Sequence, residues 1–359
     1  MTTTTPTQVN VLRPFAAYRC ERSLVCCHEP FAAVVTPDDE VRLRAALAET
    51  EAGRTVLATL GETIIDTLGD PTRGREWKKY EGRCMHLVIE GDPMGRGCGL
   101  HHIVGLGRLP ASCRNFPRIV RDTGDALEVS FELSCPTAAR LLSEDPEPMT
   151  IATLPAESWS YPAVAHGPVS ADHRALRDAW WRVFRDGRKD ASAALAAIGA
   201  LLESPLAPPS EPPTALPEAL GRPAMPMAAM IIVHSILTIP QRAMHYALVA
   251  GELTRELTEP WTVARMVMAA EPAPELLMAF VEHQAHQLVL HPATAPEVVL
   301  TLAARRALAV LRVVDGLCDR VPFRTRTLFS DAFTACARID PALGRPESIG
   351  PRAQAPSNP

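Results

Sequence analysis

The chain has 359 residues, of which 47% are hydrophobic and 21% are charged, and its formal net charge is −5. A chain of this length can bury a full hydrophobic core, and two domains are the usual arrangement. The acidic balance gives no general electrostatic attraction to nucleic acid or to anionic membranes, so we expect neither as a partner. Aromatic residues make up only 5% of the chain, which argues against a β-sandwich and favours helices rich in Ala and Leu.

The first residues contain no charged region followed by an apolar one, so we expect no signal peptide and a cytoplasmic protein. Structural disulfides are rare in that reducing compartment. The most apolar run, Ala228–Ile239, is too short to cross a bilayer, and we expect a buried helix there.

In chain order, residues 1–13 are expected to form a disordered lead. Thr36 and Pro37, followed by three acidic residues, predict a helix that starts there and runs to about Glu49. Composition then predicts a helix over 52–68 and a short strand over 85–90. A glycine-rich loop with at most one helical turn is expected over 91–107.

A hairpin is predicted from residues 118–121 and 126–133, which flank a turn. Leu127, Val129 and Phe131 alternate with polar residues, which is typical of a half-buried strand. A helix then begins at Pro136, with Ser134 or Cys135 at its cap.

After a proline-rich connector over 146–169, the sequence becomes helical. The helices are expected over 170–203, 226–256, 261–269, 273–291, 295–318 and 323–339. A proline-rich loop over 204–226 separates the first two, and 341–359 is expected to be a disordered tail. We therefore predict an α+β protein that is mostly α. A small, loop-rich cysteine-cluster domain over 14–145 precedes an all-helical domain over 170–340.

Cysteine is crowded into the front of the chain, where seven of the nine lie within the first 135 residues. They are Cys20, Cys26, Cys27, Cys84, Cys98, Cys113 and Cys135. Thiolates gathered in one region are the usual ligands of zinc or of an iron–sulfur cluster. Cys26 and Cys27 could pair with each other only through a strained ring, whereas both can turn toward one metal. We therefore favour a metal over disulfides.

The residues around these cysteines form ordered motifs. Tyr18 opens the first group, and the later motifs are Cys84-Met-His86-Leu87, Cys98-Gly-Leu-His101, Cys113-Arg-Asn-Phe116-Pro117 and Cys135-Pro-Thr-Ala138-Ala139-Arg140. In this order, residues 15–145 resemble the YkgJ-like cysteine-cluster family, which is described as zinc- or iron-chelating, and especially its flagellin lysine-N-methylase branch. Ser23 stands where that family has its second cysteine, and serine is a poor ligand for soft metals.

The resemblance implies an iron–sulfur cluster of the 4Fe–4S kind and S-adenosylmethionine as methyl donor. It also implies a protein-lysine N-methyltransferase whose substrate is a lysine-bearing, flagellin-like protein. One cluster needs four thiolates and seven cysteines are present. The ligands that we rank first are Cys20, Cys26, Cys27, Cys113 and Cys135. Cys98 and Cys84 rank after them. The sequence assigns no catalytic residue and no pocket for the methyl donor.

Two other interpretations stay open. The metal could be zinc or iron in a non-catalytic module with a structural, sensing or partner-binding role. Alternatively, low-pKa thiols such as Cys135 could sense oxidants. Histidine can replace thiolate as a ligand, and His101, three residues after Cys98, is the best candidate in a set that also holds His28, His86 and His102.

His283 and His286 lie one turn apart on a predicted helix, and we interpret them as part of an amphipathic face rather than as a metal pair. The basic segment 174–189 could suit nucleic acid. However, its apolar residues fall on one helical stripe that predicts core packing, formed by Leu176, Trp180 and Phe184. The glycines of 91–107 match no nucleotide-binding motif.

Overall fold

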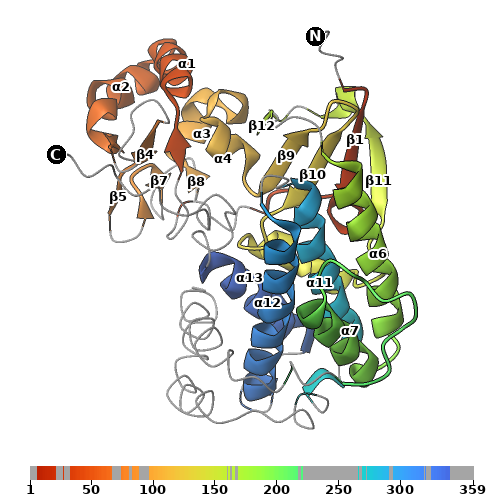
Figure 1. The fold of residues 1–359 in the computed structure, drawn as a ribbon. Helices are drawn as coiled ribbons and strands as arrows, with labels where there is room; N and C mark the ends of the chain where they lie inside the picture. The colour runs from red at the N-terminus through yellow and green to blue at the C-terminus, as the bar shows by residue number, and fades with distance from the viewer. Residues whose placement is uncertain are drawn as a thin grey trace, which may run out of the picture. The chain divides into compact units, whose positions relative to one another are not determined.

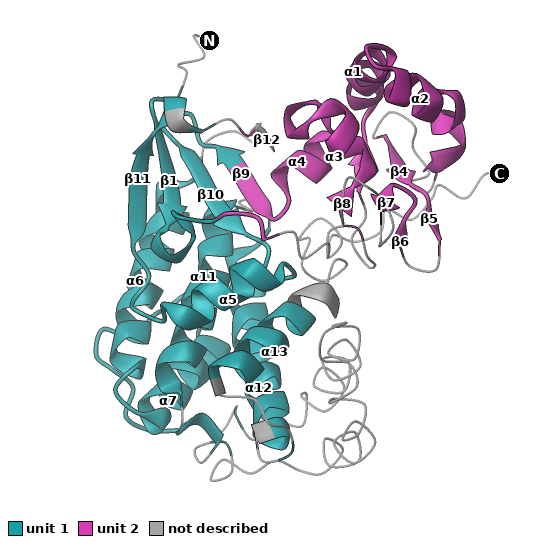
Figure 2. Ribbon diagram, turned by 180° about the vertical axis from the view of Figure 1, so that it is seen from behind, with its two compact units in different colours: residues 1–18, 121–159, 164–359 teal, residues 19–120, 160–163 magenta. Residues whose placement is uncertain are grey.

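The fold is shown in Figure 1 as a computed structural model. The structure describes residues 6–21, 27, 33–66, 74–80, 83–88, 97–159, 161, 164–165, 169–216, 220, 266, 269–271, 273–290, 294–318, 320 and 325–339. The chain divides into two compact units (Figure 2), of which unit 1 comprises 1–18, 121–159 and 164–359, and unit 2 comprises 19–120 and 160–163. The protein is a mixed α+β protein with a helical C-terminal region.

Unit 1 is built on a five-stranded sheet with the order β11-β1-β10-β9-β12. In chain order its strands are β1 (Gln8–Leu12), β9 (Arg118–Asp122, whose last two residues belong to this unit), β10 (Leu127–Phe131), β11 (Ile151–Pro155) and β12 (Val164–Ala165). β1 pairs in parallel with β10 and antiparallel with β11. The predicted disordered lead over 1–13 is therefore wrong for β1, whose Val9, Val11 and Leu12 are fully buried. The predicted connector 146–169 contains β11 and β12.

Polar residues of β10 are buried together with the apolar ones, so the predicted half-buried alternation is wrong. Glu128 and Ser130 are 3% and 0% exposed. Their partners come from two helices, since Glu128 lies 3.5 Å from Arg174 and Ser130 lies 3.3 Å from His283. Helices that carry complementary side chains can bury both faces of an otherwise alternating strand.

The described part of unit 1 also contains α-helices (Figure 2). They are α5 (Pro136–Glu144), α6 (Ala171–Gly187), α7 (Ala191–Glu203), α11 (Pro274–Leu290), α12 (Pro296–Cys318) and α13 (Thr325–Ile339). The single helix predicted over 170–203 is divided in two. The carboxylate of Asp190 accepts a hydrogen bond from the backbone N–H of Ala193 and so caps α7.

Helix α11 packs against α6, α7, α12 and β10 and is buried on nearly every side. The predicted amphipathic face is therefore wrong: Glu282, His283 and His286 are 0%, 2% and 0% exposed. Gly187 at the end of α6 allows a close approach, because a Cβ there would lie 2.7 Å from the sulfur of Met278.

The predicted core stripe of α6 is confirmed for Trp180 and Phe184, which are both fully buried. The Trp180 indole N–H donates to the carbonyl of Pro205 at 2.7 Å. The helices predicted over 226–256 and 261–269 lie outside the described residues, apart from short helical pieces, and so does the tail 341–359. Among the helices that the structure describes, none is both long and apolar enough to span a membrane.

Unit 2 is small and carries short strands. Its helices are α1 (Pro37–Ala48), α2 (Glu51–Thr63), α3 (Gly99–Val104) and α4 (Ala111–Asn115). A three-stranded sheet in the order β2-β4-β3 holds Val34–Val35, Arg75–Trp77 and Ile64–Ile65. Two more strand pairs join β5 (Lys79–Tyr80) to β6 (Arg83–Cys84) and β7 (Leu87–Val88) to β8 (Gly97–Cys98).

The helix start predicted at Thr36 is confirmed by a capping box. The Thr36 hydroxyl accepts from the backbone N–H of Asp39 at 3.1 Å, and the Asp39 carboxylate accepts from that of Thr36 at 3.3 Å. The second helix ends at Thr63, five residues earlier than predicted, where β3 begins. Buried residues of these elements form one core, which includes Leu43, Leu60 and Trp77.

Candidate metal centre

Helix α4 carries Cys113 and is tied to its unit by two hydrogen bonds. The backbone N–H of Ala111 donates to the buried carboxylate of Asp39 at 3.2 Å. The hydroxyl of Ser112 donates to the carbonyl of Val34 at 2.6 Å. These bonds fix the first turn of α4 against α1 and β2, and Cys113 packs against the core of unit 2.

Two further thiols share the surroundings of Cys113. Cys84 in β6 and Cys98 in β8 pack against the same apolar core. Burial raises the pKa of Cys113 to about 12, and the negative charges of Cys98 and then Cys84 act in the same direction. The side chains of Trp77 and Ser112 oppose the shift by hydrogen bonding to the sulfur. Ionisation of Cys98 or Cys84 therefore opposes ionisation of Cys113.

Two imidazoles of the same unit keep a buried nitrogen without a hydrogen-bond partner. Among the described residues, nothing bonds to the Nε2 atoms of His86 and His102. His86 packs edge-on against Trp77, with ring centroids 4.5 Å apart, and burial lowers its pKa to about 4. His86 is therefore neutral at pH 7, which is the form that binds metals.

The position of His102 depends on a glycine beside one of the thiols. A Cβ on Gly97, the residue before Cys98, would lie 2.7 Å from the Nε2 of His102. His101, which the sequence favoured, lies in α3, and its ring centroid is 6.2 Å from that of His102. His28 lies outside the described residues.

The other predicted cysteines have different surroundings. Cys20 is exposed and Cys27 is 8% exposed, and Cys26 lies outside the described residues. Cys135 belongs to unit 1, where it stands at the N-cap of α5 as predicted, and its sulfur lies 3.5 Å from the hydroxyl of Tyr18. Cys135 is only 3% exposed, which does not suit the accessible thiolate that oxidant sensing requires.

The donor set of unit 2 fits a transition metal in its chemistry. Thiol sulfur and neutral imidazole nitrogen are the ligands that zinc and iron–sulfur centres use. Within the described part of the chain, no three His, Cys, Asp or Glu side chains are arranged as a ready metal site. Coordination would therefore need the side chains of Cys84, Cys98 and Cys113 to turn toward one another.

Sequence reasoning did not single out two residues that organise this region. Trp77 interacts with both Cys113 and His86, and Asp39 joins the start of α1 to α4. The only sequence signal for Asp39 is its place in the capping box, and Trp77 has none beyond its being a large apolar residue. Both act through contacts with residues that are distant in the chain.

Comparison with known proteins adds no relative. A scan against protein-family models gives no match, and searches among curated proteins and solved structures give none either. The resemblance to the cysteine-cluster family therefore rests on the motifs of the chain itself.

Proposed function

We propose that unit 2 binds a metal centre through the thiolates of Cys84, Cys98 and Cys113. The observation that carries this proposal is that three cysteines from β6, β8 and α4 pack against one apolar core. The half-buried thiol of Cys113, which packs against that core, has two other thiols as electrostatic neighbours. A cation would compensate the charge that such a group acquires when it ionises, and metal binding requires this ionisation.

The remaining ligands distinguish two kinds of centre. A fourth thiolate from Cys20, Cys26 or Cys27, which belong to the same unit, would complete the set for an iron–sulfur cluster, which the sequence resemblance implies. An imidazole from His86 or His102 would instead complete a Cys₃His set, which is typical of structural zinc. The buried, unpartnered Nε2 atoms of both histidines support the second set as a specific alternative.

Two roles correspond to these centres. The first is S-adenosylmethionine-dependent methylation of a protein lysine, which the sequence resemblance alone supports. The second is a non-catalytic module in which the metal organises unit 2. Incubation of metal-loaded protein with labelled S-adenosylmethionine and flagellin tests the first role. Transfer of label to lysine supports it, and its absence favours the second.

The test of the metal itself is anaerobic purification followed by elemental analysis and absorption spectroscopy. Broad absorption near roughly 400 nm indicates an iron–sulfur cluster, since sulfur-to-iron charge transfer falls there, whereas a colourless protein that contains zinc indicates the Cys₃His site. Single Cys→Ser variants at positions 84, 98 and 113 are expected to lose the metal. Cys336→Ser is the matched control, because Cys336 is a buried cysteine of α13 in unit 1.

Two results would contradict the proposal. One is native protein that contains neither iron nor zinc above background. The other is full metal content in all three variants at 84, 98 and 113. His86→Ala and His102→Ala then separate the two centres, since only zinc bound by a Cys₃His set should be lost when an imidazole is removed.

A further inference from the structure

Unit 1 contains a pocket of about 370 Å³ between α6 and the start of β11. This volume is at the low end of the range for small-molecule sites, which is about 300–1,000 Å³. Residues 149–151 line one side. Helix α6 lines the other with mostly charged side chains, namely those of Arg177, Asp178, Trp181, Arg182 and Arg185.

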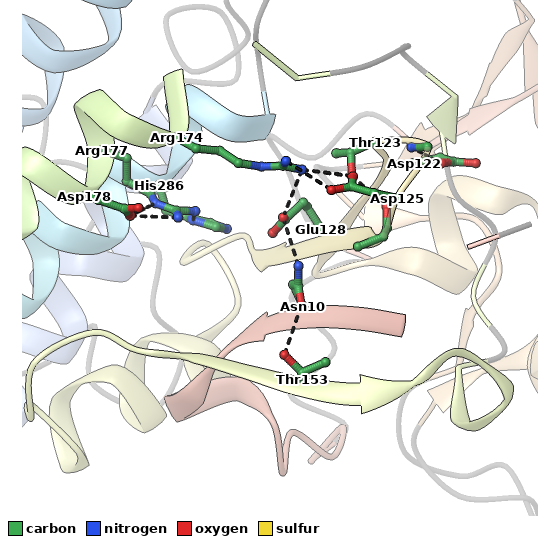
Figure 3. Close-up of polar contacts among 12 residues, drawn as sticks. Asn10, Asp122, Thr123, Asp125, Glu128, Thr153, Arg174, Arg177, Asp178 and His286 are labelled. Atoms are coloured by element: carbon green, nitrogen blue, oxygen red, sulfur yellow. Dashed lines mark hydrogen bonds and ion pairs between the residues drawn. The ribbon is translucent and has the colours of Figure 1, made fainter. Parts of the chain in front are cut away.

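The guanidinium of Arg177 is held in place before any ligand binds. It donates to the Asp178 carboxylate through Nε at 2.9 Å and lies 4.7 Å over the ring of Trp181. Its Nη1 lies 3.4 Å from Nδ1 of His286 (Figure 3). Since Arg177 is a permanent donor, Nδ1 of His286 is the acceptor in this contact. An arginine fixed on three sides loses little freedom when it binds an anion.

The next two arginines of the helix differ from their neighbours because neither is in direct contact with a carboxylate of the described residues, although Arg185 acts on Glu282 at longer range. Arg174 pairs with Asp125, as Figure 3 shows, and Arg188 pairs with Glu282. By contrast, no carboxylate in the described part of the chain forms an ion pair with Arg182 or Arg185, and both arginines are exposed. The pocket lining therefore holds three guanidinium groups and one carboxylate, an excess of two positive charges.

We propose that this pocket binds a small organic phosphomonoester. A phosphomonoester carries a charge of about −1.5 to −2 at neutral pH, which matches the excess of the lining. Arginine binds phosphate oxygens through two parallel N–H donors. Ile151 provides partly exposed apolar surface for the organic part. The proposal does not depend on the metal centre in unit 2.

Single-stranded nucleic acid is the less suitable ligand for this surface. Proteins that bind single strands stack successive bases on exposed aromatic side chains. The aromatic residues of α6 are buried, since Trp180, Trp181 and Phe184 are 0%, 4% and 0% exposed. A small organic phosphate needs no aromatic side chain for stacking, because the arginines can bind its phosphate group.

Calorimetric titration of the full chain with phenyl phosphate tests the proposal. The wild type should show saturable binding, whereas phenol should show none. Arg182→Ala and Arg185→Ala should each weaken binding by about tenfold or more, the usual effect of losing a hydrogen bond to a charged group. The double variant should show no measurable binding. Because both side chains are exposed, circular dichroism is expected to show unchanged helix content.

Arg305→Ala is the matched control, since Arg305 is an exposed arginine of α12 that does not line the pocket. It should bind phenyl phosphate as tightly as the wild type. Equal weakening in this control would overturn the proposal, because the attraction would then be general charge. Absence of saturable binding to the wild type would also overturn it. So would equally tight binding of inorganic phosphate, or binding of a single-stranded oligonucleotide in place of phenyl phosphate.

Discussion

In unit 1 the buried carboxylates of Glu128 and Glu282 lie beside arginines, whereas in unit 2 the half-buried thiol of Cys113 has other thiols as electrostatic neighbours. Glu282 accepts from Arg188 at 2.5 Å, and Glu128 lies 3.5 Å from Arg174. In unit 2, the electrostatic neighbours that raise the pKa of Cys113 are two further thiols. Buried ionisable groups need a partner of opposite charge. Glu128 and Glu282 draw this partner from their own chain, as Asp39 of unit 2 does from Arg42, and we propose that the thiols of unit 2 draw theirs from a metal.

Removal of the metal should have the largest effect, because it should destabilise unit 2 and leave unit 1 folded. Structural metal sites in small domains contribute about 10 kcal/mol or more to folding, so treatment with a chelator under reducing conditions should unfold unit 2. Amide hydrogen exchange should then show loss of protection in α1 and α2 and unchanged protection in α11. Equal protection of α1 and α2 before and after verified metal removal would contradict a structural role for the metal.

The internal pairing of unit 1 can be broken at Arg188. In Arg188→Met the carboxylate of Glu282, which is 0% exposed, keeps its burial but loses its ion-pair partner. Removing one member of a buried pair typically costs about 3–5 kcal/mol of unfolding free energy. Urea unfolding followed by circular dichroism measures this loss. Lys189→Met is the control, because Lys189 pairs with Asp186 at the surface and such pairs contribute at most about 1 kcal/mol.

Local signals predicted those parts of the fold that depend on residues close in sequence. Thr36 and Asp39 define the start of α1 within a single turn, and that prediction is confirmed. β1 was missed because its strand forms through distant pairing: Asn10 and Glu128, which bond at 3.1 Å, are 118 residues apart. The burial of Glu128 was missed for the same reason, since Arg174 reaches it from another element.

The same distinction between local and distant signals applies to the candidate site. Cysteine as a ligand type is visible in the sequence, but its grouping depends on packing between elements. The ranking by local motif placed Cys98 and Cys84 last, whereas the structure groups both with Cys113. The contact of Tyr18 with Cys135, 117 residues away, could not be predicted from either motif alone.

The pH dependence of unit 1 provides a finer test through His283. Burial lowers the pKa of His283 to about 4, and its Nε2 donates to the carbonyl of Phe131 at 3.0 Å, so the folded state holds it neutral. In the unfolded chain its pKa returns to about 6.5, so that between pH 6.5 and 4 the unfolded state binds the extra proton. The stability that His283 contributes is complete above pH 6.5 and is lost as the pH falls through this window.

His283→Gln keeps a side-chain donor for the Phe131 carbonyl but does not titrate. The unfolding free energy of the wild type minus that of the variant should fall by about 3 kcal/mol from pH 7.5 to pH 4. Groups with shifted pKa values that both proteins share, such as Glu128, Glu282 and His86, cancel in this difference. A difference that stays constant with pH would mean that His283 is not held neutral.

The smallest predicted effect concerns the cap that links α1 to the candidate site. Thr36→Ala removes the hydroxyl that accepts from the N–H of Asp39, and loss of such a cap typically costs about 1 kcal/mol. Because Asp39 also accepts from Ala111, the first residue of α4, hydrogen exchange should increase in α1 and α4 and stay unchanged in unit 1. Thr55→Ala, at an exposed interior position of α2, should change stability by only a few tenths of a kcal/mol. If exchange increases in α1 but stays at the wild-type rate in α4, loss of the cap does not affect α4 through Asp39. The thiol of Cys113 is then held in place by Ser112 and the core alone.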